Sequence, residues 1–397
     1  MKKEQPILGK TGTLLFLVVI SAFPPLSTDL YLPALPTMLT VFKTNQSMVN
    51  LTLSVYLVTY ALGLLFWGPL SEKFGRKPIM LLGTAIYFMA SVLCALAINI
   101  EFLIFARVLQ AFGGSAITIV ATAIVKDLYD GREREKIMAT IISLVTLAPL
   151  VAPAFGALLL KFTSWRMIFV VLSVFAALSA VLVMCYQETL KEKYSGSVVR
   201  SWSRLAFVLN NRNFTSLLFV FSITSMPFMA FIAAGSYIYI DHFGFSGQTF
   251  SYLFAFNALF ASVGPRIYIK VSERVSLQHI VTASFSLLIV TGVITYWFGH
   301  LSPWLFAMLT AVATLAVVTL RVPGMNLMLE QQDSDTGSAV AIIQFVRMMC
   351  GAAAMVLVSL QADNLISNLG MIQAVIGVLG CLLWFRLRKH SASTSIK

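Results

Sequence analysis

The sequence has few charged residues. Only 11% of its 397 residues are charged, whereas 58% are hydrophobic. Soluble domains carry about 25% charged residues, so this chain has too few charges to cover a water-exposed surface of its size. Long apolar runs recur along the chain, and each approaches the ~20 residues that span a bilayer as a helix. The composition therefore excludes an ordinary soluble domain and predicts an all-α protein embedded in a lipid bilayer.

Cysteine and histidine are also scarce, with four residues of each. Cys94, Cys185, Cys350 and Cys381 fall within apolar runs without metal-ligand spacing, which favours small apolar filler over a disulfide framework. The histidines are scattered over loops, span edges and the C-terminal tail. No zinc, phosphate-loop or nucleophile-elbow pattern occurs. The sequence thus argues against an enzyme and predicts no metal and no cofactor.

Twelve apolar segments are long enough to cross a membrane as helices. We expect spans at residues 13–38, 46–68, 78–98, 101–124, 137–161, 165–187, 213–240, 249–271, 276–299, 302–328, 337–361 and 366–388. The longest connection, residues 188–212, is polar and basic. It divides the chain into a six-helix bundle at 1–187 and a second at 213–397, which ends in a short basic tail.

Lysine and arginine set the expected orientation, because cytoplasmic loops carry an excess of both. With the N-terminus inside, most of the 28 Lys and Arg residues fall in cytoplasmic segments, and Lys43, Lys161 and Arg166 are those in outer loops. This bias places both termini in the cytoplasm. It also accounts for the net charge of +12 without nucleic acid, so we expect no nucleic-acid partner.

The first expected span contains the stretch FPPLSTDLYLPALP, residues 23–36, with one acid, Asp29, and four prolines. An ionised carboxylate at bilayer depth costs about 2.5–3.5 kcal/mol, so such residues usually face a cavity and carry function. Each proline leaves a backbone carbonyl without its helical partner, which is tolerated at this depth only against protein or water. We therefore expect a bent, water-facing helix whose Asp29 carries protons; the alternative is a structural acid paired with an arginine.

Three arginines lie within spans: Arg107, Arg321 and Arg347. Arg107 lies at a depth similar to that of Asp29, counted from the outer ends of their spans. We hypothesise that a proton, Arg107 and the substrate compete for the Asp29 carboxylate. Arg347 lies near the middle of its span and either binds a polar or anionic substrate group or rests on backbone carbonyls. Arg321 lies nearer the inner face, where its side chain can reach the interface.

Four segments resemble one family, the major facilitator superfamily. Residues 68–77, GPLSEKFGRK, are similar to its G-x-L-a-D-r-x-G-r-k loop, with Glu in place of Asp at residue 72. Residues 107–114, RVLQAFGG, resemble its R-x-x-Q-x-x-G signature. Residues 148–157, APLVAPAFGA, resemble the antiporter motif of its drug exporters. Residues 27–36, STDLYLPALP, resemble the Bcr/CflA drug-exporter branch.

The resemblance implies a major facilitator fold of twelve helices and a multi-pass location in the cytoplasmic (inner) membrane. It also implies proton-coupled efflux of amphipathic drugs, of multidrug or phenicol type, by alternating access. Superfamily exporters often carry a second acid eight residues before Asp29, where this chain has Ser21, which argues against two-proton coupling.

The motifs assign roles to particular residues. Gly68, Glu72, Gly75 and Arg76 would form a gating loop that acts as a charge latch between the two helix bundles, with a solvated loop as the alternative. Asp127, at the inner end of the fourth span, would also serve gating contacts. Pro149, Pro153 and Gly156 form the antiporter motif, although helix packing through a face of small residues explains them nearly as well.

The expected substrate contacts are less specific. We expect them among polar and aromatic side chains on the spans, namely Tyr31, Tyr56, Asn257, Gln344 and Arg347. The alternative function is a transporter of the same fold that exports a metabolite, sugar or siderophore, since substrate choice depends on pocket shape. The expected partners are a small-molecule drug and protons, and a monomer suffices for alternating access.

Overall fold

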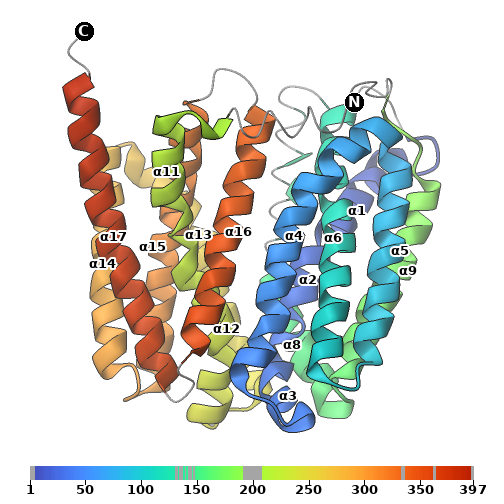
Figure 1. The fold of residues 1–397 in the computed structure, drawn as a ribbon, viewed down its shortest axis with the longest axis horizontal. Helices are drawn as coiled ribbons and strands as arrows, with labels where there is room; N and C mark the ends of the chain where they lie inside the picture. The colour runs from blue at the N-terminus through green and yellow to red at the C-terminus, as the bar shows by residue number, and fades with distance from the viewer. Residues whose placement is uncertain are drawn as a thin grey trace. The chain divides into compact units, whose positions relative to one another are not determined.

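The computed structural model is almost entirely helical (Figure 1). It describes residues 5–129, 133, 137–138, 140–141, 145, 148–190, 208–331, 336–360 and 364–394. The chain divides into two compact units, Met1–Ser201 and Trp202–Lys397. The boundary falls within the connection expected at residues 188–212, and the part of that connection at 191–207 lies outside the described residues. No β-strand occurs in the described ranges.

Unit 1 is a bundle in which α6 packs against α4 and α5, α5 against α9, and α2 against α8. Its helices are α1 (Gly9–Ser21), α2 (Phe23–Asp29), η1 (Leu32–Ala34), α3 (Leu35–Phe42), α4 (Gln46–Phe74), α5 (Arg76–Ala95), α6 (Ile100–Leu128), α8 (Ala148–Phe162) and α9 (Arg166–Cys185). Side chains from several of these helices meet around the middle of α6, so the deepest part of unit 1 is centred on this helix.

The first span is broken twice, as its prolines predict. α1 ends at Ser21, and α2 begins with Pro24 and Pro25 in its first turn. A 3-10 turn, η1, then follows α2 because Pro33 lacks the N–H that would continue the helical ladder. The expectation of a bent first helix is therefore confirmed. The expectation that this helix faces water at Asp29 is not met, because Asp29, the last residue of the short central segment, is only 6% exposed.

Unit 2 contains α11 (Arg212–Ser222), α12 (Ser225–Tyr237), η2 (Ile238–His242), α13 (Gly247–Ser272), α14 (Leu277–Phe298), α15 (Pro303–Leu329), α16 (Thr336–Ser359) and α17 (Leu365–Thr394). α14 packs along α17, α12 against α16, and α13 against α15 (Figure 1). The first span of this unit is also broken, between α11 and α12, just before Pro227. Both units thus begin with an interrupted span.

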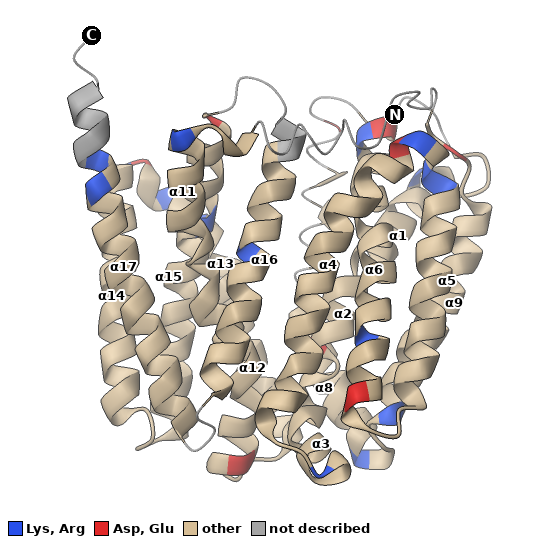
Figure 2. Ribbon diagram, in the orientation of Figure 1, with Lys and Arg blue, Asp and Glu red and all other residues tan. Residues whose placement is uncertain are grey.

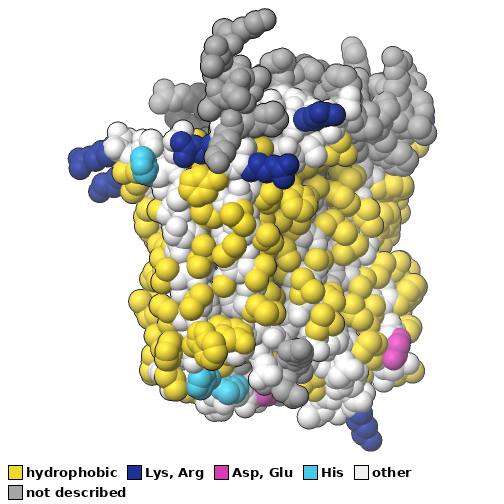
Figure 3. Space-filling model, turned by 60° about the vertical axis from the view of Figure 1, so that its left-hand side comes forward, with side chains coloured by type: hydrophobic (Ala, Val, Ile, Leu, Met, Phe, Trp, Pro, Cys, Tyr) yellow, Lys and Arg dark blue, Asp and Glu magenta, His cyan; other side chains and the backbone are white. Residues whose placement is uncertain are grey.

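Ten segments in the described part of the chain are long and apolar enough to cross a membrane. α13 has sufficient length but is not among the ten, because polar residues such as Asn257 and Arg266 interrupt its apolar sequence. The fifth expected span is represented by a shorter apolar helix, Val151–Phe162, and much of its earlier part lies outside the described residues. Exposed side chains on the spans are mostly hydrophobic (Figure 3), as a lipid environment requires.

In unit 2, most Lys and Arg gather at one end of the helices, whereas unit 1 carries them at both ends (Figure 2). In unit 2, the opposite end carries Trp297 near the end of α14 and Trp304 at the start of α15, each 64% exposed. Tryptophan is enriched where a membrane span reaches the water interface. The two ends therefore differ as the two interfaces of a multi-pass protein do.

We expect the substitution Gly113→Ala to destabilise unit 1. A Cβ at Gly113 would lie 2.6 Å from the carbonyl oxygen of Gly83 and from the backbone nitrogen of Tyr87, so α5 and α6 would have to separate. Overpacking of this kind costs about 1–3 kcal/mol. Thermal unfolding of the purified protein in detergent should show a lower midpoint for Gly113→Ala. The control Gly12→Ala, whose added Cβ would meet nothing nearer than 3.4 Å, should melt like the wild type; equal midpoints for both variants would contradict the packing argument.

Candidate functional site

The Asp29 carboxyl lies at the C-terminal end of α2 and is 6% exposed. The Thr28 hydroxyl donates to its Oδ1 at 2.9 Å. The same hydroxyl lies 3.1 Å and 3.3 Å from the carbonyl oxygens of Pro24 and Pro25, so its single proton can turn toward the backbone instead. Asp29 is thus a buried acid with one hydroxyl neighbour. That hydroxyl can donate to the ionised carboxylate, or accept from the protonated carboxyl while it donates to the backbone.

Arg107 lies in the middle of α6 and is fully buried. Its Nη1 donates to the Ser27 carbonyl at 3.0 Å and to Gln110 Oε1 at 2.6 Å, and its Nε donates to the Thr52 carbonyl at 3.4 Å. Among the described residues, no carboxylate lies within ion-pairing distance of its guanidinium. Its charge is therefore stabilised by neutral acceptors from α2, α4 and α6.

Aromatic rings complete the surroundings of Arg107. The guanidinium carbon lies 4.2 Å from the ring centre of Tyr56, 5.3 Å from that of Tyr31 and 5.9 Å from that of Phe169, all within the range of cation–π attraction. In the described part of the chain, Arg107 Nη2 and the Tyr56 hydroxyl have no hydrogen-bond partner. Buried polar atoms are normally paired, so each of these two groups has the capacity to bind a further polar atom.

Arg107 reaches the turn that bears Asp29 through the backbone. The Tyr31 N–H bonds to the Thr28 carbonyl in a 3-10 pattern, which leaves the Ser27 carbonyl for Arg107. Arg107 and Asp29 are thus close, as expected. The contact joins the Arg107 side chain to the backbone at the end of α2 and not to the Asp29 carboxylate. Direct competition for the carboxylate remains a prediction.

Sequence reasoning gave no role to the residues that orient Arg107. Gln110 accepts from Arg107 and donates from Nε2 to Ser91 Oγ at 2.8 Å. The hydroxyls of Ser27 and Tyr87 lie 2.5 Å apart beside it. The three-residue spacing from Arg107 to Gln110 places both on one helix face and could have indicated the pair. Ser91 and Tyr87, on α5, carry no comparable signal.

The antiporter-motif residues lie on α8, which packs against α2 and η1. A Cβ at Gly156 would collide with the carbonyl oxygen of Leu30, the residue that follows Asp29. Pro153 is buried and Pro149 half-buried on the same helix. Residue 156 is therefore glycine for a steric reason, because only glycine lets α8 lie against the backbone that positions Asp29.

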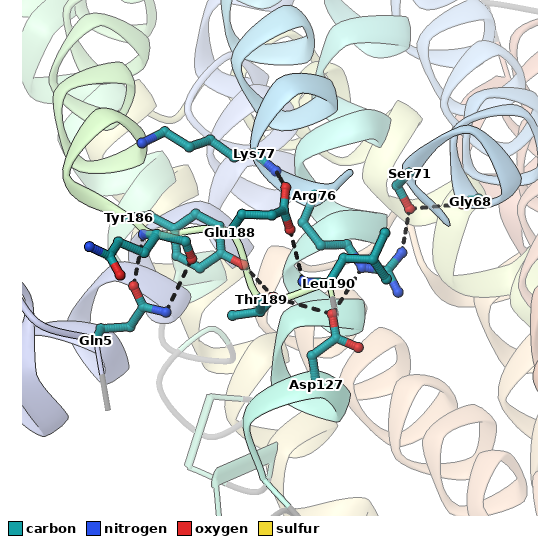
Figure 4. A network of polar contacts seen from close by, with 11 residues as sticks. Gln5, Gly68, Ser71, Arg76, Lys77, Asp127, Tyr186, Glu188, Thr189 and Leu190 are labelled. Atoms are coloured by element: carbon teal, nitrogen blue, oxygen red, sulfur yellow. Dashed lines mark hydrogen bonds and ion pairs between the residues drawn. The ribbon is translucent and has the colours of Figure 1, made fainter. Parts of the chain in front are cut away.

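The gating-motif residues meet at one end of unit 1 (Figure 4). Arg76 Nε forms an ion pair with Asp127 Oδ2 at 3.0 Å, with side chains 6% and 17% exposed. Arg76 Nη1 donates to Ser71 Oγ at 2.7 Å, and Ser71 Oγ donates to the Gly68 carbonyl at 2.8 Å. Gly75 has a φ of 109°, which favours glycine.

Glu72 does not take part in this arrangement. Its side chain is exposed and forms no ion pair with any residue that the structure describes. The acid that pairs with Arg76 is Asp127 on α6. The motif therefore ties the α4–α5 turn to the end of α6, a link that lies wholly within unit 1.

The remaining candidates lie in unit 2. Asn257 on α13 is 2% exposed, and within the described residues neither of its amide atoms has a hydrogen-bond partner. Gln344 Oε1 on α16 is likewise unpartnered there, and the side chain of Arg347, one turn later, is half-buried. The Arg347 carbonyl accepts from Ser225 Oγ at 2.8 Å. These polar groups remain candidates for substrate contact.

Comparison with known proteins agrees with the motifs. The Major Facilitator Superfamily model matches residues 15–355. An uncharacterised MFS-type transporter of Bacillus subtilis, YdgK, is 29% identical over 94% of both chains. A bicyclomycin resistance protein homologue of Haemophilus influenzae is 32% identical over 68% of this chain and 70% of its own. A chloramphenicol resistance protein of Pseudomonas aeruginosa is 34% identical over 62% and 59%.

Solved transporters share the fold at low sequence identity. A bacterial homologue of the human lysosomal transporter Spinster, in an inward-facing and unoccupied conformation, matches with a TM-score of 0.78 and 14% identity over 98% of both chains. A D-xylose–proton symporter matches with a TM-score of 0.70 and 15% identity over 94% of this chain and 97% of its own. These likenesses concern the fold alone.

We expect Gly156→Ala to slow transport severalfold, because the added methyl group would push the Leu30 peptide away and displace the Asp29 carboxyl. Uptake into everted membrane vesicles, normalised to the amount of protein, would measure this. Val151→Ile adds one carbon at a 62% exposed position of α8 and should leave transport unchanged. Equal transport by the two variants would contradict the prediction that α8 positions Asp29.

We also expect Arg107→Lys to fail as a replacement. Lysine keeps the charge, but its single nitrogen cannot reach the Ser27 and Thr52 carbonyls and Gln110 together as the planar guanidinium does. Transport should fall at least tenfold, the factor for a loss of about 1.4 kcal/mol. Lys126→Arg, at the end of α6, makes the opposite exchange outside this site and serves as the control. Wild-type transport by Arg107→Lys would show that charge alone is required.

Proposed function

Because the chain belongs to the major facilitator superfamily, we propose that it exports amphipathic drugs of the multidrug or phenicol type across the cytoplasmic membrane in exchange for protons. The relatives named for bicyclomycin and chloramphenicol resistance support the drug class. The observation that carries the proposal is the buried Asp29 at a helix end whose Ser27 carbonyl is held by the buried Arg107.

The physical basis is the cost of an ionised carboxylate in a buried position. Three changes lower that cost at Asp29: binding of a proton, approach of a cation such as Arg107, or hydrogen bonds from a bound substrate. Thr28 already supplies one such bond. Since all three act on the same carboxyl oxygens, occupancy by one disfavours the others. Binding of substrate then favours release of the proton, which is the requirement for antiport.

Arg107 contributes in two ways. Its bond to the Ser27 carbonyl ties the helix end that bears Asp29 to α6, so a change at Asp29 is transmitted to the centre of unit 1. Its free Nη2 offers a donor to a carbonyl, hydroxyl or nitro oxygen of a drug, while the rings of Tyr31 and Tyr56 offer apolar contact. Asn257, Gln344 and Arg347 would supply further polar contacts.

Alternating access gives the exchange its direction. A transporter that reorients readily with either a proton or a substrate on Asp29, and poorly with the carboxylate empty, exchanges the two instead of leaking. The Arg76–Asp127 pair, formed in this structure, would open or close as the gating contact of that cycle. One proton per substrate is the expected ratio, because Ser21 stands where a second acid would lie.

The test is transport by purified protein in liposomes with an entrapped pH dye. Phenicols, lipophilic cations and metabolites are added in turn to the wild type, Asp29→Asn and Asp241→Asn. Asp241 is an exposed acid in η2 of unit 2 and serves as the matched control. Wild type and Asp241→Asn should move protons when one drug class is added, and Asp29→Asn should not.

Other results would change the proposal. Uphill transport by Asp29→Asn on a proton gradient would show that Asp29 is not the coupling acid. Proton movement evoked by a metabolite, sugar or siderophore, and not by drugs, would identify a different substrate class on the same fold. Substrate movement without a proton signal in the wild type would exclude proton antiport.

A further inference from the structure

The four residues that follow Tyr186 at the end of α9, here named the post-α9 segment (residues 187–190), lie across the gating motif (Figure 4). None of these residues belongs to a motif recognised in the sequence. Three described parts of unit 1 nevertheless bond to this segment: the residues just before α1, the turn between α4 and α5, and the end of α6.

Glu188 holds the turn between α4 and α5. Its Oε2 accepts the backbone N–H of Lys77 at 3.0 Å, and its Oε1 accepts the N–H of Leu190 at 3.0 Å. The first N–H groups of a helix have no partner within the helix, so Glu188 caps the start of α5. A Cβ at Gly75 would lie 2.7 Å from Glu188 Oε2, so the absent side chain of Gly75 makes room for this carboxylate.

Thr189 reaches the ion pair itself. Its Oγ1 donates to Asp127 Oδ2 at 3.2 Å, the same oxygen that pairs with Arg76 Nε. The Tyr186 hydroxyl lies 2.5 Å from Thr189 Oγ1. Burial raises the pKa of the Tyr186 phenol, so its hydroxyl stays protonated and can donate to Thr189. Tyr186, Thr189 and Asp127 thus form one chain of hydrogen bonds that ends on the ion pair.

Two further contacts fix the segment at its beginning. The side chain of Gln5 bonds in both directions to the backbone of Gln187, donating at 3.2 Å and accepting at 2.8 Å. The Lys77 ammonium donates to the Met184 carbonyl in the last turn of α9 at 2.7 Å. These contacts anchor the N-terminal end of the segment, whereas its C-terminal end continues into the connection toward unit 2.

We propose that the post-α9 segment is a positioning element for the Arg76–Asp127 pair: Thr189 donates to the Asp127 carboxylate, and Glu188 holds the start of α5, the helix that bears Arg76. Loss of either contact would then weaken the gating contact proposed for unit 1. This inference goes beyond the proposed function and holds for any substrate or coupling ion.

Hydrogen exchange without substrate tests the role of Glu188. Exchange is followed by mass spectrometry in a peptide that covers the Lys77 amide, for the wild type, Glu188→Ala and Glu101→Ala. Glu101 is an exposed acid in the first turn of α6, so Glu101→Ala removes the same charge as Glu188→Ala. The Lys77 amide should exchange about tenfold faster in Glu188→Ala alone, as expected for a lost bond to a charged acceptor. Unchanged exchange would overturn the proposal.

Transport tests the role of Thr189, with variants chosen to preserve the fold. Thr189→Val keeps the shape and removes the hydroxyl, whereas Thr189→Ser keeps the hydroxyl. We expect the maximal transport rate to fall severalfold in Thr189→Val with KM unchanged, and to stay at the wild-type value in Thr189→Ser. In an Asp127→Asn background, Thr189→Val should cause no additional loss.

The pattern of results separates the outcomes. An equal loss from Thr189→Val with and without Asp127 would show that the segment acts independently of the ion pair, as a merely structural element would, and would overturn the positioning role. Size-exclusion profiles of each variant confirm folding. If the wild type moved none of the tested substrates, the transport proposal would fail, while the exchange experiment would still decide whether Glu188 holds the turn.

Discussion

The arrangement of unit 1 depends on keeping the Arg107 cation inside a membrane-spanning bundle without a carboxylate beside it in the described residues. An unpaired buried charge is costly, so its donors must find strong acceptors. The end of α2 supplies one of them. α2 stops at Asp29, and the Tyr31 N–H bonds to the Thr28 carbonyl, which leaves the Ser27 carbonyl to Arg107. The cation then sits at a helix C-terminus, where a positive charge is favourable.

This one contact connects several features that otherwise look separate. The break in the first span is required to expose the Ser27 carbonyl, and the same break places Asp29 at a helix end. α8 lies close against that break because residue 156 is glycine. The carbonyl of Thr52 ties α4 to the same guanidinium. The prolines of the first span, Asp29, Arg107 and the α8 motif thus pack into one site. Protonation of Asp29 would affect this whole site.

Sequence could predict the parts of this account that depend on residue type and spacing. The helical fold and most spans followed from apolar runs, and the broken first helix followed from the prolines at 24, 25 and 33. The position of Asp29 and Arg107 within spans followed from the sequence, but the burial of Asp29 did not, since a water-facing helix was expected there. α13 corresponds to the expected span 249–271, although its polar residues keep it out of the ten most apolar segments.

The contacts that join these parts could not be predicted, because they depend on tertiary placement. The acceptors of Arg107 from α2 and α4 are backbone atoms, which leave no trace in a sequence. Arg76 pairs with Asp127, 51 residues away, and not with the nearby Glu72. The role of Glu188 depends on where α9 ends and how the chain turns beside Lys77. Local pattern thus identified the chemical groups, and packing decided their partners.

The central claim is that substrate and proton exclude each other at Asp29. The most direct measurement is release of protons when substrate is added to purified protein in weakly buffered detergent solution, with a pH dye in the bulk phase. The account predicts about one proton per bound substrate for the wild type, by the competition argued above. It predicts no proton release for Asp29→Asn, although that variant should still bind substrate. Proton release that persists in Asp29→Asn, or substrate binding by the wild type without any release, would contradict it.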